Sequence, residues 1–190
     1  ALHFQAQVDT ASGRLTGAEA LLRWQHEGQN IPPDQFIPVA EDTGLIIAMG
    51  DWVIDRAIAH ILEWRHLYGD IPPIAINLSP RQFWRPALSH LVLDKLRAAG
   101  LPASALEVEV TESVLLHAEA GSLEELQNFR ESGVRIALDD FGTGYSSLSY
   151  LRRLPINILK IDRSFIIDLT SPTESATSQA LVRAIIAMAH

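Results

Sequence analysis

The fold is decided by one stretch of the sequence, Arg135-Ile-Ala-Leu-Asp-Asp-Phe-Gly-Thr-Gly-Tyr145. Its first half is a short apolar run, which predicts a buried strand. The strand stops at two adjacent carboxylates, Asp139 and Asp140, and a loop with glycines at 142 and 144 follows. Because neighbouring carboxylates repel each other, the pair needs either a cation or strong hydrogen-bond donors. The alternative for this stretch alone is that Asp140 caps the next turn and Asp139 is solvated.

The composition indicates one globular domain. The chain has 190 residues, of which 47% are apolar, and this is enough for one substantial core. No apolar run approaches the ~20 residues of a bilayer-spanning helix, so we expect a cytoplasmic protein or the cytoplasmic domain of a larger membrane protein. The absence of cysteine excludes disulfides and thiolate metal sites. A net charge of −8 without a basic cluster argues against a nucleic-acid polymer as partner.

Strand-like and helical segments alternate outward from the opening stretch. Alternating or continuous apolar runs predict further strands over residues 2–8, 16–24, 74–79, 106–112 and 157–162. Helical patterns lie between them and predict helices from 34 onward, around 53–61, from 79 to 100, around 123–129, over 147–153 and around 181–188. Repeated strand and helix units of this kind indicate a parallel sheet.

Two helix starts have capping signals. Asp42 or Thr43 is expected to cap the helix that carries the apolar stripe at 53–61. Ser79, followed by a proline and then Gln82, has the form of a capping box, so a helix should begin directly after the strand and end at Gly100.

Polar residues gather at the expected strand ends. In a parallel barrel the chemistry collects at the C-terminal ends of the strands. The polar residues that lie there or on the barrel axis are Glu19, Asn77, Glu109, Asp139, Asp140 and Lys160. If the acids converge, about four negative charges share one mouth and require cations. Oxygen ligands without cysteine or a paired histidine favour Mg²⁺ or Mn²⁺ over Zn²⁺. Taken singly, Glu19 also fits a strand-edge glutamate, and Lys160 a solvated lysine.

Two ions sharing a bridging carboxylate would suit a phosphodiester substrate and a water activated for in-line displacement. Asp139 and Asp140 could then each face a different ion. Lys160 could orient the water or stabilise developing charge, and Arg23 could hold a phosphate oxygen.

Five motifs follow one another along the chain: Glu19-Ala-Leu-Leu-Arg-Trp24, Asn77-Leu-Ser79, Glu109-Val-Thr-Glu112, Asp139-Asp-Phe-Gly-Thr-Gly-Tyr-Ser-Ser147 and Leu159-Lys-Ile-Asp162. In this order they resemble the motifs of the EAL-domain family of bacterial cyclic di-GMP phosphodiesterases. The resemblance implies a TIM-like (β/α)8 barrel with an antiparallel first strand. It also implies hydrolysis of cyclic di-GMP to linear pGpG with Mg²⁺ or Mn²⁺, and a homodimer formed near the helices that flank the 140–147 loop.

The resemblance also implies roles for individual residues. Glu19, Asn77, Glu109 and Asp139 would be metal ligands, Asp140 would be a ligand of the second ion, and Lys160 would contact the catalytic water. Glu112 would hold the 140–147 loop, and Gln5 and Arg23 would contact the substrate.

Two departures from the family pattern matter. Ala6 stands where the family commonly has proline after the first-strand glutamine. The last two strand and helix units are also missing, and with them a strand-seven glutamate and a late guanine-contacting glutamine. We therefore expect residues 1–190 to be a C-terminally incomplete EAL domain of a longer chain, in which other domains can be present. The alternatives to the enzyme are a catalytically weak or inactive cyclic di-GMP receptor and a scaffold that works through dimer contacts.

Overall fold

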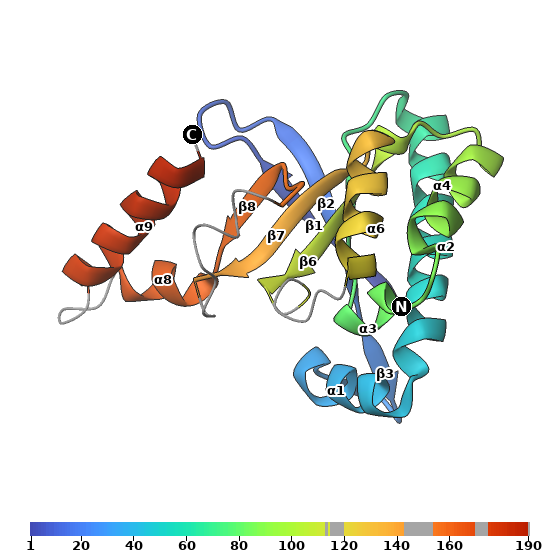
Figure 1. Ribbon diagram of the computed structural model, residues 1–190, viewed down its shortest axis with the longest axis horizontal. Coiled ribbons are helices and arrows are strands. Elements are labelled where there is room, and N and C mark those ends of the chain that lie inside the picture. The colour runs from blue at the N-terminus through green and yellow to red at the C-terminus, as the bar shows by residue number, and fades with distance from the viewer. Residues whose placement is uncertain (113, 115–119, 143–153, 170–174, 190) are drawn as a thin grey trace.

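One curled sheet organises the molecule (Figure 1). The computed structural model describes residues 1–112, 114, 120–142, 154–169 and 175–189. Its 6-stranded sheet has the order β1-β2-β5-β6-β7-β8. The strands are β1 Leu2–Val8, β2 Leu15–Leu22, β5 Ile74–Asn77, β6 Leu106–Thr111, β7 Arg135–Phe141 and β8 Ile158–Ile161. The pair β1·β2 is antiparallel, and every later pair is parallel. This confirms the predicted TIM-like barrel order with an antiparallel first strand; β1 and β8 are the edges of the sheet as described.

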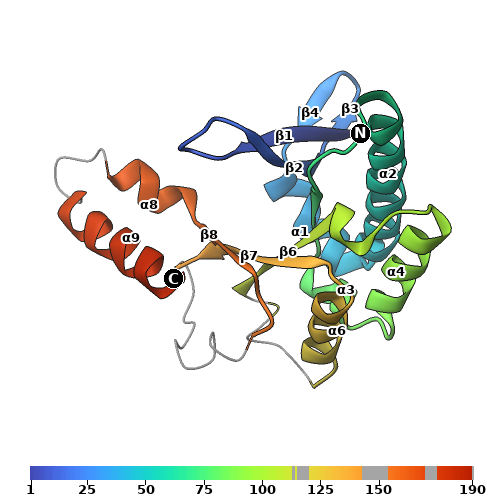
Figure 2. The ribbon, with the colours of Figure 1, turned by 90° about the horizontal axis from the view of Figure 1, so that it is seen from above.

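Helices cover the outer face of the sheet at one end and continue beyond it at the other. The helices are α1 Pro33–Thr43, α2 Leu45–Tyr68, α3 Pro80–Phe83, α4 Leu88–Ala98, α6 Ala120–Glu131, α8 Arg163–Asp168 and α9 Ser175–Ala189, with a 3-10 turn at Ala103–Ala105. Figure 2 shows α2 and α4 at one end of the molecule and α8 and α9 at the other. Within the described residues, no helix is long and apolar enough to cross a membrane.

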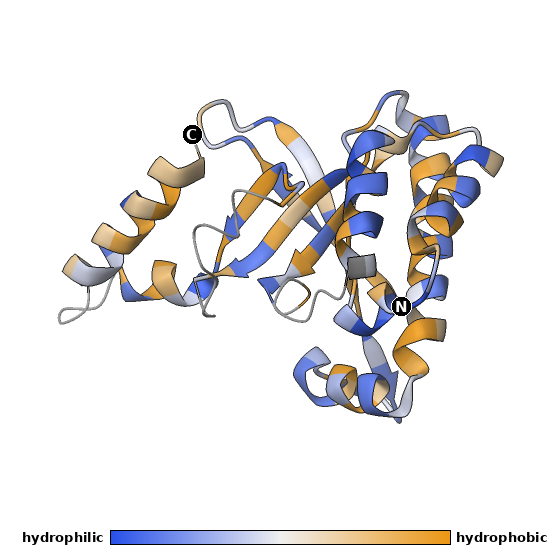
Figure 3. Ribbon diagram, in the orientation of Figure 1, coloured by the Kyte–Doolittle hydropathy of each residue, from blue (hydrophilic) through white to orange (hydrophobic). Residues whose placement is uncertain are grey.

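The alternation of residues in β6 separates the core from the barrel interior. Leu106, Val108 and Val110 are buried in the hydrophobic core together with residues of α2 and α6. Successive side chains of a strand point to opposite faces, so Glu107 and Glu109 point the other way. The alternating hydrophilic and hydrophobic bands of β6 are visible in Figure 3. The strand therefore places carboxylates on the concave side of the sheet.

The structure corrects two helix boundaries. The predicted capping box is confirmed at Ser79, but the helix does not run on to Gly100: α3 ends at Phe83 and α4 begins at Leu88. Pro86 lies in the break, where it supplies no backbone donor. The caps expected for the next helix were also wrong, because Gly44 in the left-handed conformation separates α1 from α2.

Besides the 3-10 turn, two strands and one helix had no counterpart in the sequence prediction. They are the hairpin of β3 Trp24–His26 with β4 Gln29–Ile31, and α8, which follows the side-chain cap of Asp162 on Ser164 N. The helix expected over 147–153 lies outside the described residues.

Gly50 provides a test of the packing between α2 and α3. A Cβ at Gly50 would lie 2.0 Å from Nε2 and 2.6 Å from Cδ of Gln82. Gln82 is buried, and its Oε1 accepts the Ser79 backbone N–H at 3.0 Å, so it cannot shift without loss of the capping box. We expect Gly50→Ala to lower the free energy of unfolding by about 2 kcal/mol in urea titrations. Gly121→Ala is the matched control, because nothing lies within 4 Å of its added Cβ. Equal losses in the two variants would contradict this packing.

Candidate functional site

Three carboxylates from three strands meet on the concave side of the sheet. Glu19 comes from β2, Glu109 from β6 and Asp139 from β7, and one oxygen of each lies within 4.8 Å of the others. Glu109 is fully buried, whereas Glu19 and Asp139 are half-buried. The strands place the acids here because neighbouring parallel strands in register direct equivalent side chains to the same side. These three residues could hold a metal ion.

Lys160 of β8 lies between the three acids. Its Nζ is 2.5 Å from Glu109 Oε2, 3.1 Å from Glu19 Oε2 and 3.3 Å from Asp139 Oδ2. Burial opposes the charge of this lysine, but the hydrogen bond to Glu109 and the three negative charges outweigh burial and raise the pKa of Lys160 above its ordinary value. The ammonium group is therefore charged at neutral pH and balances part of the acidic charge.

Glu109 has an oxygen that the protein leaves without a partner. Its Oε1 is buried and has no hydrogen-bond partner among the described residues. Burial raises the pKa of Glu109 to about 7, with Lys160 opposing and the charges of Glu19 and Asp139 adding to the shift. A buried carboxylate oxygen without a donor is costly unless a cation or a water binds it. The residues present thus fit a bound Mg²⁺ or Mn²⁺.

Asn77 extends the group by one amide. It ends β5, and its Nδ2 donates a hydrogen bond to Glu19 Oε1 at 2.8 Å. Asn77 pairs in register with Glu109 of β6. The hydrogen bond ties the side chain of Asn77 to the acidic group, where its amide oxygen could serve as a neutral metal ligand.

Asp140 is separate from the three-carboxylate group. Its backbone is left-handed, with φ 54°, which is uncommon for a residue with a side chain. Burial raises the pKa of Asp140, and the charges of Asp139 and Asp162 add to the shift.

Asp162, which the sequence reasoning gave no role at the site, caps α8 by accepting the Ser164 N–H at 2.9 Å. These cap hydrogen bonds lower the pKa of Asp162, and the Asp-x-Ser pattern was the signal for them.

Glu112 contacts the loop that follows β7. Its Oε1 accepts the backbone N–H of Gly142 at 2.8 Å, and the side chain is buried. The resemblance implies that Glu112 holds the 140–147 loop, and Gly142 is the residue of that loop that Glu112 contacts. The rest of the loop, residues 143–147, lies outside the described part of the chain.

A cavity of about 520 Å³ adjoins the acidic group through Asn77 and Asp140, although none of the three acids lines it. Its lining includes Arg23, Glu41, Asn77 and Asp140. Arg23 Nη1 donates to the Leu22 carbonyl at 2.9 Å, so its guanidinium group is held at the end of β2. The cavity therefore combines an arginine with groups that could bind cations.

Gln5 of β1 lies directly opposite Glu19 of β2 in the antiparallel register. Directly opposite residues of such a pair point to the same face. Gln5 is exposed, so its amide faces solvent beside the acidic group.

A second buried acid lies one step deeper in the barrel. Glu107, two residues before Glu109, is 2% exposed, and Arg135 Nη2 of β7 is 2.8 Å from its Oε2. Burial raises the pKa of Glu107, and the charge of Arg135 opposes the shift. Glu107 lies on the same face of β6 as Glu109, because the two residues are two positions apart in the strand.

Comparisons with known proteins agree with this geometry. The family model of the EAL domain matches residues 1–190. The chain is 46% identical over 190 residues to the signaling protein YkoW of Bacillus subtilis, covering 100% of this chain and 23% of that protein. It is 43% identical over 191 residues to the cyclic di-GMP phosphodiesterase NbdA of Pseudomonas aeruginosa, covering 100% of this chain and 24% of that protein.

The fold is also that of solved EAL structures. The PaMucR phosphodiesterase in complex with c-di-GMP matches with a TM-score of 0.91 and 43% identity, over 99% of this chain and 75% of that one. The chain spans only 23% to 24% of the two curated relatives named above. The match over all 190 residues and the fold agree, and the chain belongs to the EAL-domain family.

Proposed function

We propose that this domain is a metal-dependent phosphodiesterase that hydrolyses cyclic di-GMP to linear pGpG. The observation that carries the proposal is the convergence of Glu19, Glu109 and Asp139 beside a cavity, with a buried oxygen of Glu109 left without a partner among the described residues. The names of the relatives support the same substrate, because NbdA is a cyclic di-GMP phosphodiesterase and PaMucR was solved with c-di-GMP. We also propose that the protein is cytoplasmic, that the domain is part of a longer chain, and that it forms a homodimer.

The proposed roles follow from the positions of the side chains. Glu19, Asn77, Glu109 and Asp139 would hold one Mg²⁺ or Mn²⁺, and Asp140 would serve a second ion beside them. Bound divalent ions of this kind lower the pKa of a water ligand and withdraw charge from phosphoryl oxygens.

The remaining polar residues act on the substrate and the water. Lys160, held among the three acids, would orient the attacking water by hydrogen bonding. Arg23 would bind a phosphate oxygen in the cavity, and Gln5 would contact the nucleotide from β1. Glu112 would keep the 140–147 loop in place through Gly142. Water adds to phosphorus while one phosphoester bond breaks, so a 5′-phosphate and a 3′-hydroxyl are left.

A cyclic di-GMP receptor without hydrolysis is the second candidate. It is favoured by the similarity to the FimX EAL domain of Pseudomonas aeruginosa bound to c-di-GMP, which is 26% identical with a TM-score of 0.83 and covers 98% of this chain and 73% of that chain. The test is incubation of the protein with cyclic di-GMP and Mn²⁺ or Mg²⁺, followed by separation of the nucleotides. Formation of pGpG that stops with EDTA supports the enzyme. Binding without pGpG supports the receptor, and a protein that neither binds nor cleaves the nucleotide would contradict both candidates.

The raised pKa of Glu109 predicts that the affinity for the metal ion depends on pH. Because burial raises this pKa to about 7, Glu109 carries a proton in much of the population below that pH. A proton and a metal ion compete for the same carboxylate. We expect the Kd for Mg²⁺ to rise about fivefold from pH 7 to pH 6 and to change little above pH 8, as measured by titration calorimetry. In Glu109→Gln the affinity should be weak and should lose most of this dependence; an unchanged pH profile in that variant would assign the dependence to another group.

A further inference from the structure

Helix α1 is held in place by few interactions of its own. It begins after Pro32, which supplies no side-chain cap, and it contains Pro38 inside the helix. A proline at an interior position removes one hydrogen bond of the helix. Only Phe36 and Ala40 of α1 are buried. An 11-residue helix with these features depends on tertiary contacts for its position.

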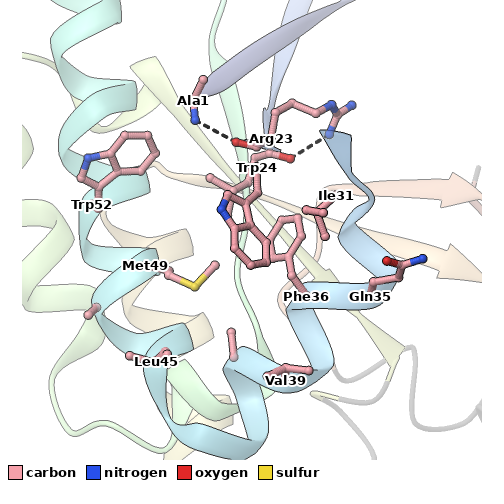
Figure 4. A pocket seen from close by; sticks show the side chains of 13 residues that line it. Ala1, Arg23, Trp24, Ile31, Gln35, Phe36, Val39, Leu45, Met49 and Trp52 are labelled. Atoms are coloured by element: carbon pink, nitrogen blue, oxygen red, sulfur yellow. Dashed lines mark hydrogen bonds between the residues drawn. The ribbon is translucent and has the colours of Figure 1, made fainter. Parts of the chain in front are cut away.

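Behind α1 lies an apolar hollow and not a packed core. Figure 4 shows Phe36 and Val39 of α1 facing Met49 of α2 and Trp24 of β3 across it. The hollow has a volume of about 770 Å³. Among the described residues, the only aromatic contact of α1 on this side is the edge-on packing of Phe36 on Trp24, whose ring centroids are 5.7 Å apart. On this side α1 is therefore held by its two buried residues, Phe36 and Ala40, at the edge of the hollow.

The opposite side of α1 forms a wall of the cavity next to the acids. Asp34, Ile37, Pro38 and Glu41 of α1 line that cavity together with Asn77 and Ser79. Helix α1 thus separates the cavity from the apolar hollow, because residues 35, 36, 39 and 40 face the hollow and residues 34, 37, 38 and 41 face the cavity. A shift of α1 changes the width of the cavity.

One hydrogen bond joins this wall to the strand end that carries Asn77. Ser79 Oγ donates to Glu41 Oε1 at 2.5 Å, and both side chains are half-buried. Ser79 is itself fixed, because its backbone N–H is bound by Gln82 and it caps α3. Among the described residues, a second polar link of α1 is the ion pair of Asp42 with Arg81 at 3.5 Å, in which Asp42 is 83% exposed. Exposed ion pairs of this kind contribute little to stability.

We infer that Glu41 is a positioning residue for cyclic di-GMP. Its hydrogen bond to Ser79 holds α1 in the position at which the width of the cavity fits the substrate. The inference rests on the proposed function. Glu41 acts through α1 and takes no part in the chemical step. Its loss should therefore weaken substrate binding and leave the metal ions and the rate of the bound complex nearly unchanged.

The test compares Glu41→Ala with Glu41→Gln in steady-state hydrolysis of cyclic di-GMP. We expect Glu41→Ala to raise KM about tenfold, the factor given by one hydrogen bond to a charged group. We expect kcat to change less than about threefold and the Kd for Mg²⁺ less than about twofold. Glutamine can still accept the Ser79 hydroxyl, so Glu41→Gln should recover KM to within about threefold of the parent. Asp42→Ala, the neighbouring carboxylate with an exposed ion pair, is the matched control and should shift KM less than about twofold.

Hydrogen exchange of the α1 amides separates the inference from the proposed function. Glu41→Ala should speed exchange over residues 33–43 and leave α4 unchanged. If the parent protein binds cyclic di-GMP without cleaving it, the variants are compared by their equilibrium Kd for cyclic di-GMP in place of KM. If the parent does neither, the proposed function fails, and exchange alone decides whether Glu41 positions α1. An unchanged KM or Kd, a fall in kcat alone, or unchanged α1 exchange in Glu41→Ala overturns the inference.

Discussion

Asp139→Asn is expected to abolish the hydrolysis of cyclic di-GMP while the fold remains intact. Asp139 is one of three acids whose oxygens lie within 4.8 Å of one another, and the amide removes one negative charge without changing the shape of the side chain. If these acids hold the ions of the proposed reaction, kcat/KM should fall by about a thousandfold or more, roughly 4 kcal/mol of transition-state stabilisation. The measurement is pGpG formation at saturating Mn²⁺, with the Kd for the metal determined in parallel.

Asp94→Asn is the control for this prediction. Asp94 lies on α4, its side chain is 69% exposed, and its partner is Arg97 three residues on. Its removal should leave activity within about twofold of the parent. If Asp139→Asn keeps more than about a tenth of the parent rate, the three-carboxylate group is not where the reaction occurs, and the receptor becomes the better proposal.

The strands were predictable from the sequence because their side-chain period is short and local. In β6 every second residue is a buried aliphatic, and the intervening positions are acids and a threonine. This alternation alone is enough to place Glu109 on the face opposite the aliphatic core. The break between α3 and α4 was not predicted, because the helical pattern of the sequence continues on both sides of Pro86. The hairpin of β3 and β4 was missed because both strands are three residues long and mostly exposed.

The members of the acidic group were predictable, but their pairings were not. The sequence suggests that Glu19, Glu109 and Asp139 converge, because the register of the predicted strands places them at the strand ends or on the barrel axis. That Lys160 contacts all three acids depends on how far β8 curls past β7, and no local pattern carries that information. The same holds for Glu41, whose bond to Ser79 spans 38 residues of sequence.

Lys160→Met is expected to destabilise the metal-free protein by roughly 3 kcal/mol at pH 8. The ammonium contacts Glu19, Glu109 and Asp139, and the side chain of Glu109 is 0% exposed. Without Lys160 no other cationic side chain of the described residues lies between these three acids. Because the folded-state pKa of Lys160 is raised, its stabilising contribution is present at every pH below its unfolded pKa, and pH 8 lies in that range. The measurement is urea denaturation with EDTA.

The sign of the pH dependence and the effect of metal distinguish this account from a simple loss of packing. Glu109 can take up a proton as the pH falls, so the loss in Lys160→Met should be smaller at pH 5.5 than at pH 8. Added Mg²⁺ should restore much of the stability at pH 8, because the ion supplies the missing positive charge. Lys95→Met is the control, since Lys95, the chain's other lysine, pairs with Asp55, whose side chain is 55% exposed, and should cost no more than about 1 kcal/mol. A loss in Lys160→Met that is equal at both pH values and indifferent to Mg²⁺ would mean that packing, and not charge, is what the lysine contributes.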